Sequence, residues 1–569
     1  MKRVFIGHRG VGKTELLKRH QIYFADIEHF DLDTEIEKQK NQTVSDIFNS
    51  EGELAFRKLE QKVFADLIKK NSFVIALGAG FDISSLTVDT LSSGIEVIYV
   101  SRRTDLDGRI FLNRPALDPK LSLLDEYQQR YQKREKNFRD RADFIYHMPE
   151  GLIETDDIEK SILTGSFVTA KAFVTSTKAI TLPHVKNIEL RTDIFTDGEI
   201  KKITLSRDHN FLVSYRKKTT VFNFKSGLID WALELGAVPS ELNSADLIVS
   251  NHDDEIQSAI HKFKSYEQFH QKLCPIINTW EELIFGHKWQ SEKPEFRSFL
   301  PRSNPVEKRS KWRWYRELQF NKQKVNFVQG SQDFDDQPSL YEYIKASLYS
   351  KNNFAAVLGS PVHHSKSPMT QYKKLNQNFI AIPLNEADFP QALSFLHILG
   401  LNCAAVTSPL KNTAGKYCKK TSAVNSLALK NNIWMSASTD EAGLIKLFEN
   451  IKEAQKNSVV VWGGGGVLKS IQDALPTAKF YSAQSQSPRT KNDFCKNPKI
   501  IVWSAPRKID VQFPPNIWKP ELVIDLNYSE NSMGIEYAKN KNLKYISGDA
   551  LFYAQAEKQL QFFKENLGF

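Results

Sequence analysis

One short glycine-rich segment, residues 7–14, constrains the fold of this chain more than any other feature. It reads GHRGVGKT and matches the pattern GxxxxGK[ST], with the apolar stretch KRVFI before it and ELLKRH after it. These flanks predict a strand that leads through the loop into a helix, the setting in which backbone N–H groups wrap phosphates. Lys13 would place its charge at the β and γ phosphates, and the Thr14 hydroxyl would ligate Mg²⁺. The glycines that would allow this wrapping are Gly7, Gly10 and Gly12. An ordinary glycine turn before a helix is the alternative, which these flanks disfavour.

Length and composition set the outer limits of the prediction. The 569 residues suggest three or four domains, and 41% hydrophobic with 25% charged residues is typical of globular chains. The net charge of +10 suits anionic substrates and nucleotides, and without a dense basic tail we expect no nucleic-acid partner. Four scattered cysteines and the lack of a long apolar run predict a cytoplasmic protein with no membrane partner.

Strand and helix patterns alternate along the chain and divide it into three segments. We therefore predict an α/β multidomain protein. Joints are expected near residues 148–157 and in the polar stretch 330–339. The predicted domains are residues 1–155, residues 165–347 and residues 352–569, the last with a substrate lobe (352–455 plus C-terminal helices) and a nucleotide lobe (456–548).

The first segment carries further motifs beyond the glycine-rich loop. FDLDTEIEK, IFNSEGELAFRKLE, VIALGAG, NRPAL and a later Arg134 follow one another in the order found in shikimate kinase. Residues 1–150 thus resemble that family, which implies a P-loop NTPase-like kinase domain that uses ATP and Mg²⁺. The resemblance implies that Asp33 and Arg57 hold the substrate's hydroxyls and carboxylate, and that Arg134 is a second carboxylate-binding arginine.

The same resemblance assigns three further features. Asp31 would lie in the second shell of the Mg²⁺, and Arg114 would be the lid arginine on the nucleotide. Gly78, Ala79 and Gly80 would form the turn beside the substrate, with a methyl at Ala79 where the family has glycine. We expect this methyl to weaken shikimate binding. For the two aspartates, the alternative is a solvated pair at the start of a helix.

The middle segment contains a lysine and a histidine at the ends of predicted strands. Glu189 and Arg191 are two residues apart on a strand and therefore point to the same face. His252 ends a second strand, and Lys272 begins a third. At the strand ends of a βα barrel, a lysine can form an imine with a ketone while a histidine moves protons. A purely structural lysine and histidine are the alternative interpretation.

This arrangement resembles type I 3-dehydroquinate dehydratase. The resemblance implies that Lys272 is the Schiff-base lysine and His252 the proton carrier, with Glu189 and Arg191 at the substrate. It also assigns three further residues to the substrate: Arg216, Arg313 and Gln337. Because the segment is shorter than the roughly 200–250 residues of a full barrel, we expect a trimmed βα barrel. Read alone, EKRSKWRWYREL could bind nucleic acid, but we favour a barrel segment that carries Arg313.

The last segment contains the apolar stretch VVVW, four consecutive glycines and a helical pattern. A strand, a glycine turn and a helix form the cradle that binds a dinucleotide's pyrophosphate. The four glycines are Gly463, Gly464, Gly465 and Gly466. VLGSPVHHSKSPM, VTSPLK, TSAVNSLAL, STDEAG, VIDLNYSE and GDALFYAQA surround them in the order of shikimate dehydrogenase. Residues 354–569 thus resemble that family, which implies a two-lobed dehydrogenase with a Rossmann-type lobe.

This resemblance implies that Lys411 and Asp440 form the catalytic pair, a proton donor and the carboxylate that holds it. The substrate-binding residues it implies are Ser365, Ser367, Thr407, Asn425, Asp440, Tyr528 and Gln555, and Gly548 would lie at the nucleotide. Ala405 stands where the family has asparagine. NADP(H) is expected by resemblance, with NAD(H) left open, because the usual arginine for the 2′-phosphate is absent and only Lys479 and Arg489 lie nearby.

The three resemblances name consecutive steps of one pathway, in the order of the C-terminal part of the pentafunctional AROM protein. They imply dehydration of 3-dehydroquinate, reduction to shikimate and phosphorylation of shikimate by ATP. The expected partners are small carboxylates, and a homodimer is possible. The alternative is a regulator that descends from the same domains and senses shikimate-type ligands without catalysis. The presence of Lys272 and of the Lys411–Asp440 pair favours an enzyme.

Overall fold

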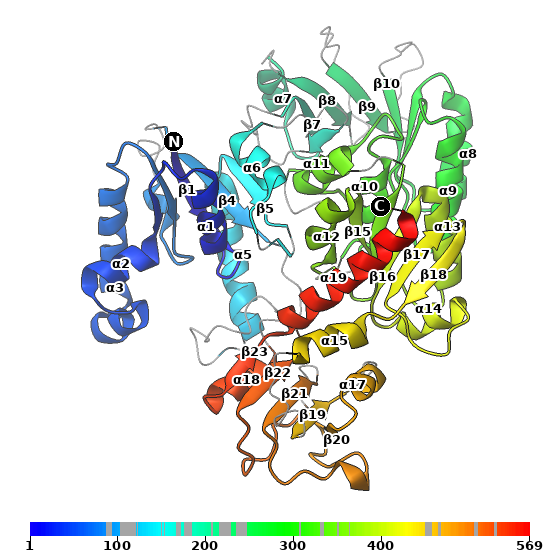
Figure 1. Cartoon of the computed structure of the whole chain (residues 1–569). Helices are drawn as coiled ribbons and strands as arrows, with labels where there is room; N and C mark the ends of the chain where they lie inside the picture. The colour runs from blue at the N-terminus through cyan, green and yellow to red at the C-terminus, as the bar shows by residue number, and fades with distance from the viewer. Residues whose placement is uncertain are drawn as a thin grey trace. The chain divides into compact units, whose positions relative to one another are not determined.

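In the part of the chain that the structure describes, the strands form four β-sheets (Figure 1). Most described residues before residue 350 form one compact unit, and those after residue 351 form most of a second. No helix within the described residues is long and apolar enough to cross a lipid bilayer. The computed structural model describes all residues except 87–93, 103–120, 122, 150, 153, 167–171, 176–184, 206–208, 216–228, 235–246, 307–308, 331–334, 350–351, 364, 450–457, 465–467, 506–509, 528–531 and 569.

The first sheet carries the glycine-rich loop. Its five strands are parallel, in the order β2 (His29–Asp31), β3 (Phe73–Ala76), β1 (Lys2–Ile6), β4 (Glu96–Ser101) and β5 (Phe144–His147). The helices of this part are α1 (Lys13–Tyr23), α2 (Leu32–Lys40), α3 (Val44–Leu67), α5 (Leu123–Arg141) and α6 (Asp157–Thr164). The predicted strand, loop and helix are β1, residues 7–12 and α1.

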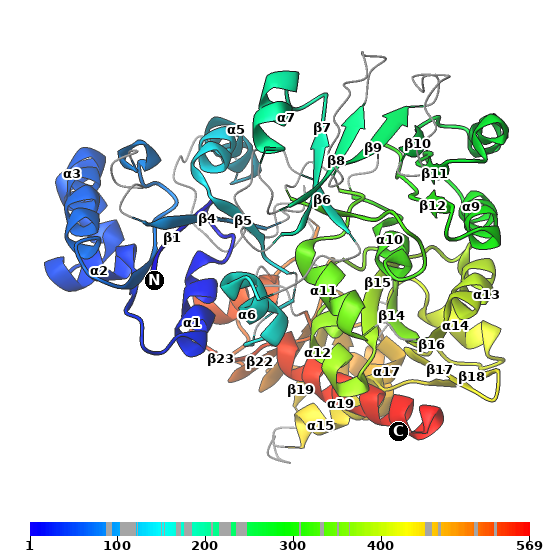
Figure 2. The ribbon, with the colours of Figure 1, turned by 90° about the horizontal axis from the view of Figure 1, so that it is seen from above.

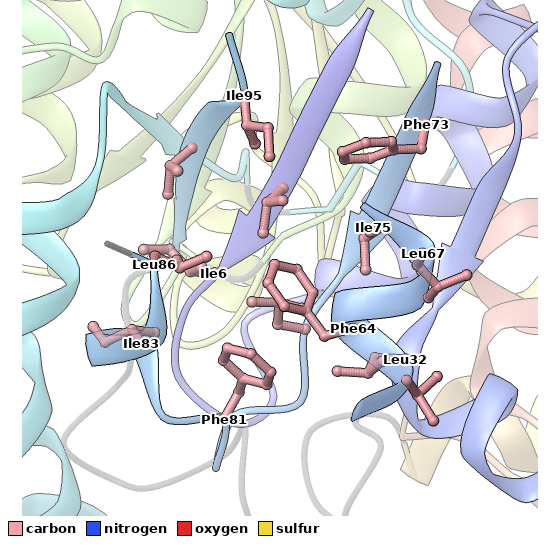
Figure 3. Packing of buried hydrophobic residues seen from close by; sticks show 14 of the residues in the cluster. Ile6, Leu32, Phe64, Leu67, Phe73, Ile75, Phe81, Ile83, Leu86 and Ile95 are labelled. Carbon is pink, nitrogen blue, oxygen red and sulfur yellow. The ribbon is translucent and has the colours of Figure 1, made fainter. Parts of the chain in front are cut away.

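Alternation along the strands builds the core of this part. Ile6 and Phe73 point to the same side of the sheet as Ile75, and there they meet Phe64 and Leu67 of α3 (Figure 3). The neighbouring Phe5 lies against His20 of α1, with ring centroids 5.6 Å apart. A parallel sheet covered on both faces needs such continuous apolar strands, and it leaves polar side chains to the loops at the strand ends.

Helix α6 is fastened to the first sheet by a buried ion pair. Glu159 accepts two hydrogen bonds from the Arg19 guanidinium, at 2.7 and 2.8 Å, and one each from Tyr23 and Tyr146. Both charged side chains are almost fully buried. The predicted end of this domain at residue 155 thus precedes α6, which contacts α1 and β5 here and also packs against α11.

The second sheet contains eight described strands, all parallel. The first of them in the chain, β6, is hydrogen-bonded to the last, β13. β6 (Phe173–Thr175) pairs with β7 on one side and with β13 on the other. The remaining strands run from β7 to β12 in chain order, and Figure 2 shows them following one another around an arc. They are β7 (Asn187–Arg191), β8 (Asn210–Tyr215), β9 (Ile229–Glu234), β10 (Leu247–Asn251), β11 (His270–Leu273), β12 (Arg297–Phe299) and β13 (Phe327–Gln329). The segment's shortness thus does not come from missing strands.

Side chains bridge the joint between β12 and β13. The Val325 N–H donates to Ser298 Oγ at 3.1 Å, and the Phe299 N–H donates to Gln323 Oε1 at 3.0 Å. The described helices around this sheet are α7 (Asp197–Ile203), α8 (Ile256–Lys262), α9 (Trp280–Glu292), α10 (Arg313–Gln319) and α11 (Leu340–Tyr349). Leu212, Ile248 and Phe327, from β8, β10 and β13, share one core cluster. Residues from distant strands can share a core only if the sheet curls.

One prediction about this part needs correction, and one alternative that we did not favour can be compared with the structure. The polar stretch 330–339 is not a joint in its described residues, because Gln337 donates to Thr175 of β6 and Asp336 accepts from the Ser303 backbone. The basic and aromatic stretch does not offer its aromatic rings to a nucleic acid. Trp312 and Trp314 are buried, since they pack against Trp280 of α9.

The last two sheets form the second unit. The third sheet has the order β15 (Asn378–Pro383), β14 (Phe354–Gly359), β16 (Leu401–Val406), β17 (Ser426–Lys430) and β18 (Ile433–Ala437), with β17 and β18 antiparallel. The fourth sheet is parallel, in the order β20 (Lys479–Tyr481), β19 (Val459–Gly463), β21 (Ile500–Ser504), β22 (Leu522–Asp525) and β23 (Lys544–Ile546).

One long helix returns from the fourth sheet to the third. α19 (Gly548–Leu567) follows β23 and packs against α15 (Asp440–Phe448) and β17. The other described α-helices are α12 (Ser367–Leu375), α13 (Phe389–Leu399), α14 (Lys411–Tyr417), α17 (Leu468–Ala474) and α18 (Met533–Asn540). The prediction of an α/β chain with several domains is confirmed.

Removing Glu159 should strongly destabilise the first domain. In Glu159→Ala, Arg19 and two tyrosine hydroxyls lose their acceptor in the interior, which should cost about 3–5 kcal/mol. Hydrogen exchange read by mass spectrometry on peptides of β1 and α1 measures the free energy of unfolding of this domain alone. The matched control is Asp66→Ala, which breaks the exposed ion pair with Lys69 and should cost less than about 1 kcal/mol. Equal effects of both substitutions would contradict the assignment of α6 to this domain.

Candidate functional site

The glycine-rich loop curls around the side chain of Lys13. Gly7, Gly10 and Gly12 have φ values of 151°, 84° and 96°, which side-chain-bearing residues rarely adopt. Lys13 Nζ donates to the carbonyl oxygens of Gly7 and His8 at 2.8 and 2.9 Å. The lysine charge therefore lies at the loop, where the N-terminus of α1 also favours anions.

An oxygen pair lies beside this loop. Thr14 Oγ1 donates to Asp31 Oδ2 at 2.8 Å, and Asp31 also caps α2. A hydroxyl and a carboxylate are ligands of the hard kind that Mg²⁺ prefers. The predicted metal-side residues are thus brought together, while Arg114 lies outside the described residues.

A second cluster surrounds the turn Gly78–Gly80, which follows β3. A Cβ at Gly78 would lie 2.8 Å from Asp33 Oδ1, and one at Gly80 would lie 2.1 Å from Arg57 Nη2. Arg134 of α5 donates to the carbonyls of Ala79 and Gly80. The structure therefore brings together the six predicted substrate residues of this segment. None of the three turn residues has a positive φ, so alanine at position 79 strains no backbone.

Burial shapes the charges in this cluster. It raises the pKa of Asp33, and the neighbouring Asp31 raises it further, against the opposing charges of Lys13 and Arg57. The sequence analysis missed Glu60, which lies three residues after Arg57 on the same face of α3 and accepts a hydrogen bond from it at 2.8 Å. Burial also raises the pKa of Glu60. Two guanidinium groups and two carboxyl groups of raised pKa thus lie together around the turn Gly78–Gly80.

In the second sheet, two predicted residues lie in the interior near the strand ends. Lys272 of β11 is 2% exposed, and its Nζ lies 4.4 Å from the ring centroid of Phe327 on β13. Glu189 of β7 accepts hydrogen bonds from Thr175 and from Ser214, the latter at 2.6 Å. Gln337 donates to the same Thr175 hydroxyl at 3.0 Å, so Gln337 and Glu189 share one network.

The described arginines predicted for this site, Arg191 and Arg313, are paired with carboxylates of the protein. Arg191 pairs with Asp193 at 2.6 Å, and Arg313 forms an ion pair with Glu342 of α11. Burial alone would raise the pKa of Glu342, but Arg313 and the Ser339 N–H lower it to about 2. Arg313 therefore already holds a carboxylate of the protein itself. Arg216 lies outside the described residues.

An arginine that the sequence analysis missed lies at the ends of β10 and β11. Arg302 donates to the carbonyl oxygens of Cys274 and His252, at 2.7 and 2.8 Å, and to Asp254. His252 directly follows β10, so Arg302 fixes the backbone of the predicted proton carrier. Its only signal in the sequence was its position three residues after the end of β12.

In the second unit, four elements converge on Asp440. Its carboxylate pairs with Lys411 Nζ at 2.6 Å and accepts hydrogen bonds from Asn425 and Gln555, each at 2.8 Å. α14, the start of β17, α15 and α19 contribute these side chains. Asp440 is 5% exposed, so its charge is held in place by partners rather than by water. The predicted pair of Lys411 and Asp440 lies together.

The predicted hydroxyl residues lie at the ends of β14 and β16. A Cβ at Gly359 would lie 2.4 Å from Thr407 Cγ2, and Ser365 Oγ accepts from the Ser367 N–H at 3.3 Å. Ala405 is buried within β16. Tyr528 lies outside the described residues.

The second glycine turn follows β19. Gly463 and Gly464 have φ values of 95° and 118°, and Arg489 donates to their carbonyl oxygens at 3.3 and 3.2 Å. Lys479 instead donates to the Asn492 carbonyl. Gly465 and Gly466 lie outside the described residues, and Gly548 is the first residue of α19. The turn lies where the order of the parallel strands reverses, the usual place of a nucleotide site.

Comparison with known proteins agrees with the first of these sites. Residues 9–169 match the family model described as shikimate kinase. A shikimate kinase of Aeromonas salmonicida is 31% identical over 170 residues, which span 29% of this chain and 92% of that protein. The chain belongs to the shikimate kinase family. This membership rests on its N-terminal part, which contains the glycine-rich loop and the Asp33 cluster.

The comparisons also find relatives of a second kind for part of the chain. An NADP⁺ shikimate dehydrogenase of Prochlorococcus marinus is 33% identical over 146 residues, which span 23% of this chain and 51% of that protein. The chain thus spans about half the length of this curated relative. A solved shikimate dehydrogenase of Aquifex aeolicus is 22% identical, with a TM-score of 0.30, and the match covers 38% of this chain and 93% of that structure.

Replacing Asp33 with asparagine should stabilise the first domain at neutral pH. The folded state raises the pKa of Asp33 above its value of 3.8 in the unfolded chain, so folding binds this proton more tightly. Stability is therefore lost as pH rises through the folded pKa, and Asp33→Asn removes that loss. Hydrogen exchange of β1 peptides at neutral and at acid pH measures it: the gain should be present at pH 7 and vanish once pH falls below the unfolded pKa. A gain that is independent of pH, or a loss at pH 7, would contradict the raised pKa.

Proposed function

We propose that this chain is a multifunctional enzyme of the shikimate pathway. It would dehydrate 3-dehydroquinate to 3-dehydroshikimate, reduce that product to shikimate, and phosphorylate shikimate with ATP. The observation that carries the proposal is the cluster around Gly78–Gly80, in which Asp33, Arg57 and Arg134 meet and where the charge of Lys13 acts on Asp33. Its substrates would be small carboxylates, which suits the two guanidinium groups.

In the kinase reaction the chain's residues position two anions. Arg57 and Arg134 would hold the shikimate carboxylate, and Asp33 would orient the attacking hydroxyl and accept its proton. Lys13 would neutralise charge that develops on the transferred phosphoryl group. Thr14 and Asp31 fit Mg²⁺, which when bound shields the charge of the ATP phosphates.

For the dehydratase we propose that the second sheet works as a βα barrel with Lys272 as its nucleophile. The Lys272 amine would attack the ketone of 3-dehydroquinate, and loss of water gives an imine. The imine draws electrons from the adjacent carbon, so that carbon's proton can pass to His252 and the neighbouring hydroxyl leaves as water. Water then hydrolyses the imine and frees the lysine. The interior position of Lys272 in β11, beside Phe327 of β13, supports this role.

For the dehydrogenase we propose that Lys411 donates a proton to the ketone oxygen of 3-dehydroshikimate. Asp440 holds the ammonium group in place, and Asn425 and Gln555 fix the carboxylate. The glycine turn after β19 fits a dinucleotide, and NADPH bound there supplies a hydride. A non-catalytic sensor would need neither the Lys411–Asp440 pair nor an interior lysine in β11.

Single lysine substitutions should separate the activities. Lys411→Ala should abolish NADPH oxidation with 3-dehydroshikimate, because the proton donor is lost, and Lys272→Ala should abolish dehydration. Each should leave ATP-dependent phosphorylation of shikimate within about twofold of wild type. Three separate rate assays on the full chain measure this, and borohydride with 3-dehydroquinate should label wild type but not Lys272→Ala. Loss of all activities together, or a folded wild type with none, would contradict the proposal.

We further propose that NADP(H) is preferred and that Arg489 recognises its 2′-phosphate. The chain leaves β20 in a turn in which Ser482 N–H donates to Ser487 O, and it returns beside the strand, where Arg489 N–H donates to Phe480 O. This return places the guanidinium at the second glycine turn. No acidic residue lies among residues 479–487, whereas NAD-binding sites use one to hold the ribose hydroxyls.

Arg489→Ala should therefore lower kcat/KM for NADPH about 10- to 100-fold and leave that for NADH little changed, since one charge-assisted contact to phosphate is lost. Lys479→Ala is the matched control, because this cation is bound to the Asn492 carbonyl instead, and it should change neither value. A wild type that prefers NADH, or equal effects on both dinucleotides, would contradict the assignment.

A further inference from the structure

His8, an unspecified position of the glycine-rich motif, is buried and bound to a distant helix. It is 4% exposed, and its Nε2 lies 2.8 Å from Glu135 Oε2 on α5. Its ring stacks on Tyr131 at 4.5 Å and meets Phe138 edge-on at 4.9 Å. Tyr131, Glu135 and Phe138 are spaced by four and three residues, so one face of α5 holds the histidine.

Glu135 gathers further donors around this contact. Tyr99 OH donates to the same carboxylate oxygen as His8 does, and Arg139 Nε donates to the other oxygen at 2.6 Å. Burial would raise the pKa of Glu135, but the bonds from His8, Tyr99 and Arg139 lower it to about 2. The carboxylate is therefore charged at any physiological pH and offers His8 a strong acceptor.

The backbone of His8 is held as well as its ring. Its carbonyl oxygen accepts a hydrogen bond from Lys13 Nζ at 2.9 Å. On α5, the residue before Glu135 is Arg134, which donates to the Gly80 carbonyl at 3.0 Å. Neighbouring residues of one helix thus hold the phosphate loop and the turn beside the acceptor pocket.

We infer that His8 is a positioning residue, which anchors the phosphate loop to α5 and thereby sets where Lys13 meets the ATP phosphates. The inference rests on the proposed kinase function. The ring of His8 is bound to α5, and the carbonyl oxygen of His8 accepts a hydrogen bond from Lys13. A shift of the His8 ring would therefore also shift the backbone oxygen that positions Lys13. The packing of the His8 ring and its hydrogen bond to Glu135 contribute separately to this anchoring, and different substitutions at position 8 can remove one without the other.

Three substitutions test this division in the full chain. His8→Phe keeps an aromatic ring but loses the donor to Glu135. His8→Gln keeps an N–H at a similar distance from the backbone. Tyr99→Phe is the matched control, because it removes a bond to the same Glu135 oxygen and keeps the ring that packs beside His8. The readouts are the dissociation constant of ATP–Mg²⁺ from calorimetry and the KM values for ATP and for shikimate.

We expect His8→Phe to weaken ATP–Mg²⁺ binding about tenfold, as the loss of one hydrogen bond to a charged group predicts. The KM for shikimate should change less than about threefold, and His8→Gln and Tyr99→Phe should bind ATP within about twofold of wild type. If His8→Phe does not fold, Glu135→Ala removes the same acceptor from the helix side and should also weaken ATP binding about tenfold.

Two results would overturn the inference: ATP affinity that is unchanged in His8→Phe or in its substitute, or equal weakening in Tyr99→Phe. Binding is measured without turnover, so the two proposals fail separately. A wild type that binds ATP–Mg²⁺ but does not phosphorylate shikimate would refute the kinase function. Normal ATP binding by His8→Phe in an active kinase would refute only the role of His8.

Discussion

The parallel pairing of strands determines where many of the candidate functional side chains of this protein lie. Parallel strands end at a common edge, and the loops that leave this edge carry most of the candidate functional side chains. The phosphate loop follows β1, the turn Gly78–Gly80 follows β3, and the second glycine turn follows β19. His252 and Thr407 directly follow β10 and β16 in the same way. In the first sheet the strand interiors are mostly apolar because both faces are covered, whereas in the second sheet Glu189 and Lys272 lie within the strands β7 and β11.

The three candidate lysines, Lys13, Lys411 and Lys272, have different partners: backbone carbonyls, a carboxylate and an aromatic ring. Lys13 donates to two backbone carbonyls of the glycine-rich loop, which hold its charge at the place where phosphates would bind. Lys411 is paired with the buried carboxylate of Asp440, which holds its amino group in place. Lys272 lies in the interior, over the ring of Phe327. These different surroundings suit the three different reactions that we propose for the chain.

The features that could be predicted from the sequence are those formed by residues close together in the chain. The strand, loop and helix around residues 7–14 and the ordered motifs of the first and last segments led to clusters that the structure assembles. Contacts between distant residues could not be predicted. Glu159 lies 140 residues from Arg19, and Glu135 lies 127 from His8, so neither the ion pair between α6 and α1 nor the contact of His8 with α5 was visible in the sequence. The ion pair of Arg313 with Glu342 depends in the same way on how α10 packs against α11.

The central claim is that one chain carries several separate pockets that act in turn on a small hydroxylated carboxylate. The most direct measurement follows ¹³C-labelled 3-dehydroquinate by NMR in the presence of the full chain, NADPH and ATP–Mg²⁺. The account predicts that signals of 3-dehydroshikimate, shikimate and shikimate 3-phosphate rise in that order. Binding of the labelled compound without any conversion, by a chain shown to be folded, would contradict it.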